Sequence, residues 1–226
     1  MRRIVRIGHR GAAGHAPENT VAAIEKGIAL GVDLVEIDVR RTADGILVAF
    51  HDETLNRTTN GKGLVDRLSL AEIQTLNAGN GEHIPTVLEV LKTAAGKAGL
   101  MLELKVNGIA QKAVEAVQKA GFKDPVIYAS FLHDELTDVR SADPEASLMV
   151  LFGRLPLAPV AKALKFKPSH VGLRYDTATR HLVEAFHDKG LLVFVYTPNS
   201  MCDIQRALSA GVDGVISNFP ERIRRE

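Results

Sequence analysis

Three acidic side chains occupy matching positions in two strand-like segments. In segment 34–39, Glu36 and Asp38 alternate with apolar residues, so both carboxylates share one face of the strand. In segment 100–106, Glu103 stands among leucines in the same way. If the apolar faces pack against helices, the carboxylates point inward and repel one another unless a cation lies between them. Hard divalent ions prefer carboxylate oxygens, so the pattern predicts Glu36, Asp38 and Glu103 as ligands of one divalent cation, Mg²⁺ or Ca²⁺.

Two histidines and two basic residues accompany these acids. His9 and His51 each follow a strand-like segment, where a barrel of parallel strands carries its catalytic groups. Histidine exchanges protons near neutral pH, so two of them beside three carboxylates favour acid–base catalysis over a structural role. Arg10 offers a planar fork that suits phosphate oxygens, and Lys105 places a second cation next to Glu103. The alternatives are a solvated rim charge for Arg10 and an internal ion pair for Lys105.

The composition is that of an ordinary globular protein, and it argues against several classes of partner. The 226 residues are 46% apolar and 24% charged, with a net charge of +1. This balance gives no support for a nucleic-acid or membrane-surface partner, so an anionic ligand must be held by a local site. The one cysteine, Cys202, rules out an internal disulfide and a cysteine-based zinc site. Because we find neither a secretory signal nor an apolar run long enough to span a bilayer, we expect a cytoplasmic protein without stable membrane anchoring. The oligomeric state is left open.

A repeated unit organises the chain: a helical pattern, a glycine, then a short apolar strand. The helical patterns cover residues 19–30, 86–97, 109–120, 179–189 and 200–210. The strand-like segments are 4–8, 34–39, 100–106, 126–130, 147–152, 170–175, 191–196 and 214–217. Alternating strands and helices predict a parallel sheet, and eight strands favour one α/β domain, residues 1–226, folded as a (βα)₈ TIM barrel. An open doubly wound sheet is the alternative.

Residues 46–84 do not fit this repeat. Segment 46–50 is strand-like, yet only residues 41–45 separate it from the strand before, too few for a parallel crossover. The Asp-Gly turn in this link suggests a local hairpin or an irregular extension at the barrel mouth, with its topology left open. Residues 54–84 are polar and rich in turns, so we expect a small loop and helix insertion over one end of the barrel.

The order and spacing of several short motifs resemble the glycerophosphodiester phosphodiesterases. The resemblance runs from Gly8 to Pro220, nearly the whole chain. Its motifs are His9-Arg10-Gly11, Pro17-Glu18-Asn19-Thr20, Glu36-Ile37-Asp38-Val39, His51-Asp52-Glu53-Thr54-Leu55-Asn56-Arg57-Thr58-Thr59, Ile84-Pro85-Thr86, Glu103-Leu104-Lys105 and Asp213-Gly214-Val215-Ile216-Ser217-Asn218-Phe219-Pro220. Each motif alone is weak, but their shared order is specific.

The resemblance implies an irregular (βα)₈ barrel related to phosphoinositide-cleaving phospholipases C, with a small insertion after the second histidine. It implies hydrolysis of glycerophosphodiesters to sn-glycerol 3-phosphate and an alcohol such as choline or ethanolamine. The implied site residues are Glu36, Asp38 and Glu103 on the divalent metal, His9 and His51 as the acid–base pair, Arg10 and Lys105 on the phosphate, and Glu18 and Asn19 at the border of the site.

The chain departs from the family pattern in two places. The family's Trp-Thr-Val-Asn is replaced by Tyr196-Thr197-Pro198-Asn199, so Tyr196 keeps an aromatic wall for the substrate while the preferred alcohol becomes uncertain. Asn218 stands where an acid is also common, and the sequence assigns it no task.

The resemblance implies a route through a cyclic phosphate, formed by attack of the glycerol 2-hydroxyl, although the residues alone equally allow direct attack by metal-bound water.

Three other functions compete with glycerophosphodiester hydrolysis. A lysophospholipase D-type phosphodiesterase would need an apolar groove near residues 54–84. A Schiff-base aldolase would use Lys105, but neighbouring carboxylates keep a lysine charged. A phosphate-binding module without catalysis would show gaps among the acid, base and metal positions, and the sequence shows none.

Overall fold

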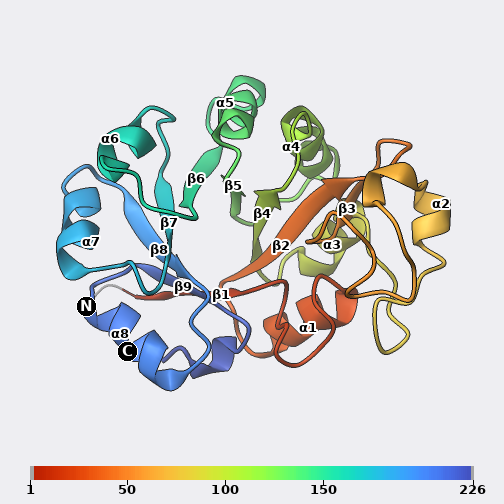
Figure 1. Ribbon diagram of the computed structural model, residues 1–226, viewed down its shortest axis with the longest axis horizontal. Helices are drawn as coiled ribbons and strands as arrows, with labels where there is room; N and C mark the ends of the chain where they lie inside the picture. The colour runs from red at the N-terminus through yellow and green to blue at the C-terminus, as the bar shows by residue number, and fades with distance from the viewer. Residues whose placement is uncertain (1–2, 225–226) are drawn as a thin grey trace.

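Eight parallel strands close into a barrel in the computed structural model, which describes residues 3–224 (Figure 1). The barrel strands are β1 (Val5–Gly8), β2 (Leu34–Arg41), β4 (Gly99–Leu104), β5 (Val126–Ser130), β6 (Ser147–Phe152), β7 (His170–Arg174), β8 (Leu192–Tyr196) and β9 (Gly214–Ser217). They pair in the order β1-β9-β8-β7-β6-β5-β4-β2, and β1 also pairs with β2. That last pairing closes the sheet. The predicted TIM barrel is therefore confirmed, and the open doubly wound sheet is wrong.

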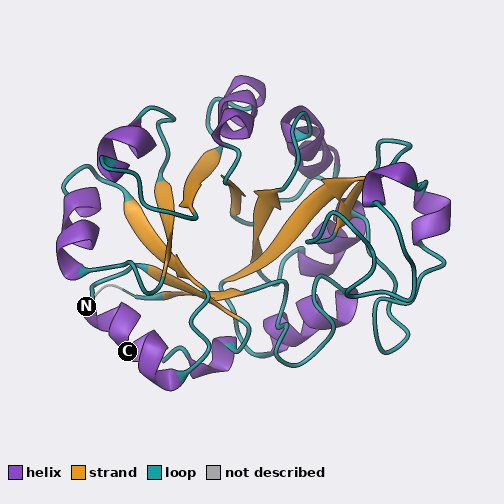
Figure 2. Cartoon of the chain, viewed as in Figure 1, coloured by secondary structure: helices purple, strands orange, loops and turns teal. Residues whose placement is uncertain are grey.

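Helices cover the outside of the barrel (Figure 2). They are α1 (Val21–Ala29), α2 (Leu70–Ile73), α3 (Val87–Ala94), α4 (Ala110–Lys119), α5 (His133–Ala142), α6 (Pro159–Leu164), α7 (Arg180–His187) and α8 (Met201–Ser209), with short 3₁₀ turns η1 (Val65–Arg67) and η2 (Pro220–Arg222). The five predicted patterns are α1, α3, α4, α7 and α8, and four of these begin after a capping Ser or Thr. Helices α5 and α6 lie outside those patterns, and neither has a side-chain N-cap. Among residues 3–224, no helix combines the length and the apolar character that crossing a bilayer requires.

The segment after β2 leaves the barrel. Strand β3 (Leu47–Ala49) runs antiparallel to the end of β2, with Val39 opposite Ala49. This hairpin settles the topology of 46–50 and explains why β2 extends beyond its predicted end. Residues 54–84 then form a small lobe beside the barrel, on the right of Figure 1, where α2 lies. The lobe packs around its own apolar cluster, which contains Leu55, Val65, Ile73 and Ile84.

The barrel interior is apolar at its base and charged where the strands end. On β2, Leu34 joins an interior cluster with Ile7 and Phe194, and Glu36 and Asp38 follow on the same face. The alternate residues of β2 belong instead to the layer between the strands and the helices. This alternation gives the acids the inward orientation that the pattern predicted. It places them toward the C-terminal ends of the strands, where TIM barrels carry their active sites.

Candidate active site

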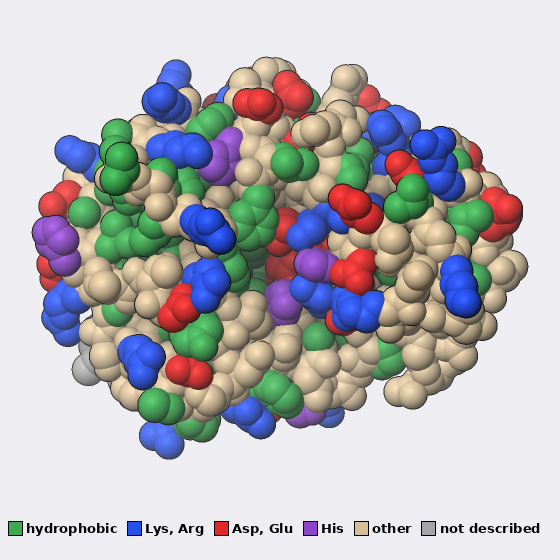
Figure 3. Space-filling model, viewed as in Figure 1, with side chains coloured by type: hydrophobic (Ala, Val, Ile, Leu, Met, Phe, Trp, Pro, Cys, Tyr) green, Lys and Arg blue, Asp and Glu red, His purple; other side chains and the backbone are tan. Residues whose placement is uncertain are grey.

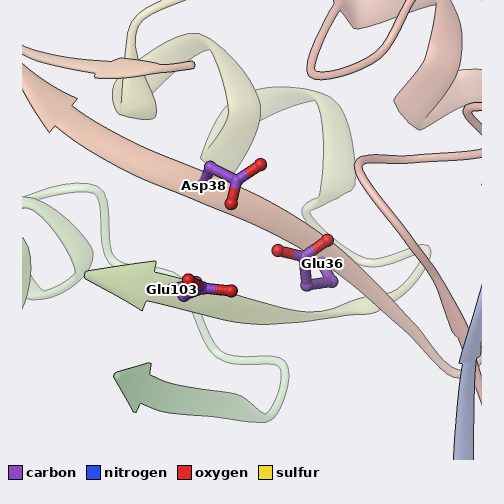
Figure 4. A group of neighbouring side chains, drawn as sticks. All are labelled: Glu36, Asp38 and Glu103. Atoms are coloured by element: carbon purple, nitrogen blue, oxygen red, sulfur yellow. The ribbon is translucent and has the colours of Figure 1, made fainter. Parts of the chain in front are cut away.

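Glu36 and Asp38 on β2 and Glu103 on β4 point toward one another at the barrel mouth (Figure 4). The register of the two strands places Asp38 opposite Glu103. One oxygen of each carboxylate lies within 4.8 Å of the others, so the group could hold a metal ion. The barrel thus brings together the three acids that the sequence predicted as metal ligands.

The three carboxylates of the acid cluster carry more negative charge than the surrounding side chains balance. Burial, and then the charges of Asp38 and Glu103, raise the pKa of Glu36 well above its usual value. Burial and the charge of Asp38 also raise the pKa of Glu103 to about 7. Glu36 Oε1 is buried, and no side chain or backbone group in the described part of the chain donates a hydrogen bond to it. A divalent cation would satisfy this oxygen and relieve the crowding of negative charge, so the residues fit such an ion.

Two basic side chains flank the acids. Arg10 Nε lies 3.3 Å from Asp38 Oδ2, and Lys105 Nζ lies 2.6 Å from Glu103 Oε1 and 3.5 Å from Asp38 Oδ1. Burial would raise the pKa of Asp38, but Arg10 and Lys105 outweigh it and hold that pKa below its usual value. Burial would lower the pKa of Lys105, but Glu103 and Asp38 hold it above its usual value. A lysine kept in its charged form suits anion binding and is a poor Schiff-base nucleophile.

Glu18 and Asn19 form hydrogen bonds with two residues of the site, Arg10 and Asp38. Asn19 Nδ2 donates to Asp38 Oδ2 at 2.9 Å, and the Asp38 N–H donates to Asn19 Oδ1 at 3.1 Å. Arg10 Nη1 donates to Glu18 Oε1 at 2.7 Å. Arg10 and Asn19 both have left-handed φ values, 51° and 60°, which residues with a Cβ rarely adopt. The structure therefore places Glu18 and Asn19 where they orient Arg10 and Asp38.

His9 directly follows β1 and lines the cavity. Its Nδ1 lies 2.6 Å from Asn218 Oδ1. An amide oxygen only accepts hydrogen bonds, so this contact assigns the proton to Nδ1 and leaves Nε2 without one. Nε2 lies 4.0 Å from Glu36 Oε2. Burial, and then the charge of Arg10, lower the pKa of His9 to about 4, so a neutral imidazole with a free Nε2 can accept a proton.

His51 follows β3 and reaches the same cavity from outside the barrel wall. Its Nδ1 lies 2.6 Å from Asp52 Oδ1, which leaves Nε2 for a substrate. Arg57 Nε donates to Asp52 Oδ2 at 2.7 Å, and the same guanidinium donates to Glu18 at 2.6 and 2.9 Å. Arg57 therefore joins the acidic partner of His51 to Glu18, the acidic partner of Arg10.

A cavity of about 190 Å³ lies over the acid cluster. It is lined by His9, Arg10, Glu36, His51, Met101, Glu103, Lys105, Phe131, Leu151, Tyr196, Thr197 and Ile216. Figure 3 shows this central hollow with acidic side chains at its floor, basic side chains and histidines on one side and hydrophobic side chains on the other. Of the predicted site residues, Glu18, Asn19 and Asp38 are the ones that do not line it. A larger depression of about 510 Å³ between α4 and α5 contains no histidine.

The sequence predicted no role for four residues that lie near the site. Asp52 and Arg57 lie in the motif that begins at His51, where their acid and base types were the available signal. Asn218 contacts His9 across the closure of the barrel. Phe131 follows β5, and an aromatic residue just past a barrel strand could have marked it as a wall of the cavity.

A TIM barrel whose mouth joins an acid cluster that could hold a cation to two histidines and two basic side chains has the parts for metal-assisted hydrolysis of a phosphate ester. Comparisons with known proteins agree. The model of the glycerophosphoryl diester phosphodiesterase family matches residues 9–222. A glycerophosphodiester phosphodiesterase of Caldanaerobacter subterraneus is 36% identical, over 96% of this chain and 95% of its own length. The chain therefore belongs to the glycerophosphoryl diester phosphodiesterase family and is an enzyme of that class.

Solved structures show the same similarity. An Oleispira antarctica phosphodiesterase, determined in complex with the product sn-glycerol-3-phosphate, matches with a TM-score of 0.90 and 30% identity, covering 98% of this chain and 95% of that chain. A glycerophosphodiester phosphodiesterase from Agrobacterium tumefaciens matches with a TM-score of 0.86 and 32% identity, covering 99% of both chains.

Proposed function

We propose that the protein hydrolyses glycerophosphodiesters to sn-glycerol 3-phosphate and an alcohol, with one divalent cation, Mg²⁺ or Ca²⁺, held by Glu36, Asp38 and Glu103. The observation that carries this proposal is the convergence of unlike groups on one cavity. An acid cluster short of positive charge lies beside two histidines with different partners, and Arg10 and Lys105 supply cations for an anion. The activity named for the relatives and the product bound to the Oleispira enzyme support the choice of substrate.

The geometry suggests how the chain's own residues act. Arg10 and Lys105 hold the phosphate oxygens and oppose the charge that develops on them. His9 accepts the proton of the glycerol 2-hydroxyl through Nε2 as that hydroxyl attacks phosphorus, and His51 donates a proton to the leaving alcohol. Water then opens the cyclic phosphate with the two roles reversed. The metal, when bound, would neutralise negative charge on the phosphodiester.

The partners of the two histidines support this division of roles. Asp52 lies 2.6 Å from His51 Nδ1 and fixes the orientation of the ring, which leaves Nε2 for the substrate. The partner of His9 is the neutral amide of Asn218, and burial already favours the uncharged ring. His9, beside the amide, therefore suits the role of proton acceptor in the first step, which leaves the role of donor to His51.

The lysophospholipase D-type alternative has no support from residues 54–84. Its apolar side chains pack into the cluster of the lobe, and among the described residues of this segment only Leu64 is a large, well exposed hydrophobic one. The apolar side chains of this segment therefore serve the core of the lobe and do not favour the groove that this function would need.

A metal add-back assay tests the proposal. Chelator-treated protein is offered glycerophosphocholine and glycerophosphoethanolamine, with each divalent ion restored singly. We expect turnover to return with Mg²⁺ or Ca²⁺, and to be lost in His9→Ala and His51→Ala while both variants unfold cooperatively like the wild type. His181→Ala, at an exposed histidine of α7, is the matched control. Turnover that needs no ion contradicts the metal site, and wild-type rates in either histidine variant contradict the acid–base pair.

A further inference from the structure

The catalytic cavity has two chemically different walls. The charged wall comes from β1, β2, β4 and the segment after β3. The opposite wall is formed by Phe131 after β5, Leu151 in β6 and Tyr196 in β8. Tyr196 Oη donates to the carbonyl of Phe152 at 2.7 Å, so its hydroxyl is already engaged. The rings of Phe131 and Tyr196 meet edge to face with centroids 5.8 Å apart. Apart from the Thr197 hydroxyl, the side chains of this wall offer hydrocarbon rather than free polar groups.

Exposed apolar residues also occur in the two loops that follow β5 and β6. Phe131 is 39% exposed, and its ring lies 3.7 Å from where a Cβ on Gly153 would stand, at the start of the loop between β6 and α6. Leu132 and Leu155 are each 36% exposed, and Leu157 is fully exposed. Because β5 and β6 pair directly, the loops that follow them emerge side by side. Figure 3 shows hydrophobic side chains gathered on one rim of the central hollow. A group of exposed apolar side chains next to a reaction site marks a binding surface.

The two ester groups of a glycerophosphodiester suit different walls. A buried glycerol hydroxyl needs a hydrogen-bond partner, and the charged wall supplies His9, the acceptor proposed for the 2-hydroxyl. The apolar wall then receives the other ester group, which is the leaving alcohol. A cationic alcohol such as choline would compete for Phe131 with Lys105, whose Nζ already lies 5.9 Å from the centre of the ring. Glu103 and Asp38 pair with Lys105 at 2.6 and 3.5 Å, so the expected preference rests on hydrocarbon burial at the apolar wall and not on charge repulsion.

We propose that Phe131, Tyr196, Leu155 and Leu157 bind a hydrocarbon leaving group, so that the enzyme prefers glycerophosphodiesters of alkyl or aryl alcohols over those of choline and ethanolamine. This inference rests on the proposed function and specifies the alcohol that it releases. Each methylene group removed from water strengthens an interaction about fourfold. A short alkyl chain that buries a few methylene groups on this wall therefore gains at least about tenfold in kcat/KM over a head group that gains nothing there.

Three substrates that stay monomeric in solution test the inference on the ion-loaded enzyme. They are glycerophosphocholine, glycerophosphohexanol, with the chain on the leaving alcohol, and 1-hexanoyl-glycerophosphocholine, with the chain on glycerol. We expect kcat/KM for the hexanol ester to exceed that for the choline ester at least tenfold. Phe131→Ala and the double variant Leu155→Ser with Leu157→Ser should each lower this ratio severalfold. Leu88→Ser, at a leucine of α3 that is 45% exposed and does not line the cavity, should keep it.

The outcomes separate this inference from the proposed function. Equal kcat/KM for the hexanol and choline esters overturns the inference, and so does a gain seen only when the chain is on glycerol. A leucine variant that loses binding to phosphatidylcholine vesicles but keeps the substrate ratio also overturns it, because the wall would then bind a lipid surface. If no phosphodiester is turned over at all, the proposed function itself fails.

Discussion

Replacing Asp52 with Asn removes the carboxylate that lies 2.6 Å from His51 Nδ1 while keeping the shape of the side chain. The amide keeps an oxygen that can accept from Nδ1, so the ring orientation is preserved. The charge is lost, and a charge-assisted hydrogen bond is worth roughly 1.5–3 kcal/mol against about 1 kcal/mol for a neutral one. If His51 must carry a proton to donate it to the leaving alcohol, the loss of about 0.5–2 kcal/mol of stabilisation leaves less enzyme able to donate and slows turnover by up to roughly 30-fold.

The leaving group makes the test specific to proton donation. Glycerophosphocholine releases an alkoxide that needs a proton, whereas glycerophospho-p-nitrophenol releases a stable phenolate that does not. We therefore expect Asp52→Asn to slow the choline ester clearly and the nitrophenyl ester hardly at all, in kcat measured at saturating ion. The matched control is Glu53→Gln, which removes one negative charge from the neighbouring, exposed position.

Equal losses for both esters would refute this reasoning, because Asp52 would then act on binding or on the attack. A loss confined to the nitrophenyl ester would also refute it. An unchanged rate for both would show that the carboxylate beside His51 has no part in the reaction.

Three further changes test the electrostatics and the packing. Glu36→Gln should weaken divalent-ion binding in calorimetry by a factor of the order of 100. It should also raise the free energy of unfolding of the metal-free protein, because it removes a charge that burial, Asp38 and Glu103 oppose. A less stable metal-free variant would contradict the conclusion that the three carboxylates repel one another. Gly11→Ala should lower the free energy of unfolding, measured with denaturant, by more than about 2 kcal/mol, because the φ of Gly11 is 90° and a Cβ would lie 2.4 Å from the Ala23 carbonyl carbon. Gly31 has a φ of 75° but open space around it, so Gly31→Ala should lower that free energy by only about 1 kcal/mol. Burial lowers the pKa of His170 to about 4. Between about pH 6.5 and 4 the unfolded chain therefore binds more protons than the folded one, so the free energy of unfolding falls as the pH drops through that range. His170→Asn should flatten the profile of unfolding free energy by up to about 3 kcal/mol; an unchanged slope would show that this histidine is not buried in its neutral form.

Local patterns predicted those parts of the fold that depend on local physics. The alternation in Leu34–Val39 set which side chains of β2 face inward, because a strand allows only two faces. The glycines after the helical patterns marked their ends, as the left-handed φ values of Gly31 and Gly211 show. The acid cluster followed from the same alternation in β2 and β4, once the two strands were expected to share a barrel.

Contacts between segments that are far apart in the sequence could not be predicted from local patterns. The bond between Arg57 and Glu18 joins residues 39 positions apart, and that between His9 and Asn218 spans 209 positions. No periodicity encodes such pairs, since they depend on how the lobe after β3 folds back and on how β9 pairs with β1. Sequence reasoning could therefore name His9 as a candidate but could not find the amide that assigns its proton.

The two histidines rest on different kinds of support, and this difference fits their proposed roles. His9 follows a barrel strand paired on both sides, and it is held by an amide from the other end of the chain. His51 follows a short antiparallel strand paired with β2, and its partner Asp52 is held by Arg57 from the lobe. Because the same Arg57 also binds Glu18, a shift of the lobe would move the carboxylate beside His51 and the carboxylate beside Arg10 together. The lobe therefore couples the position of His51, the proposed proton donor, to that of Arg10, the proposed phosphate-binding residue.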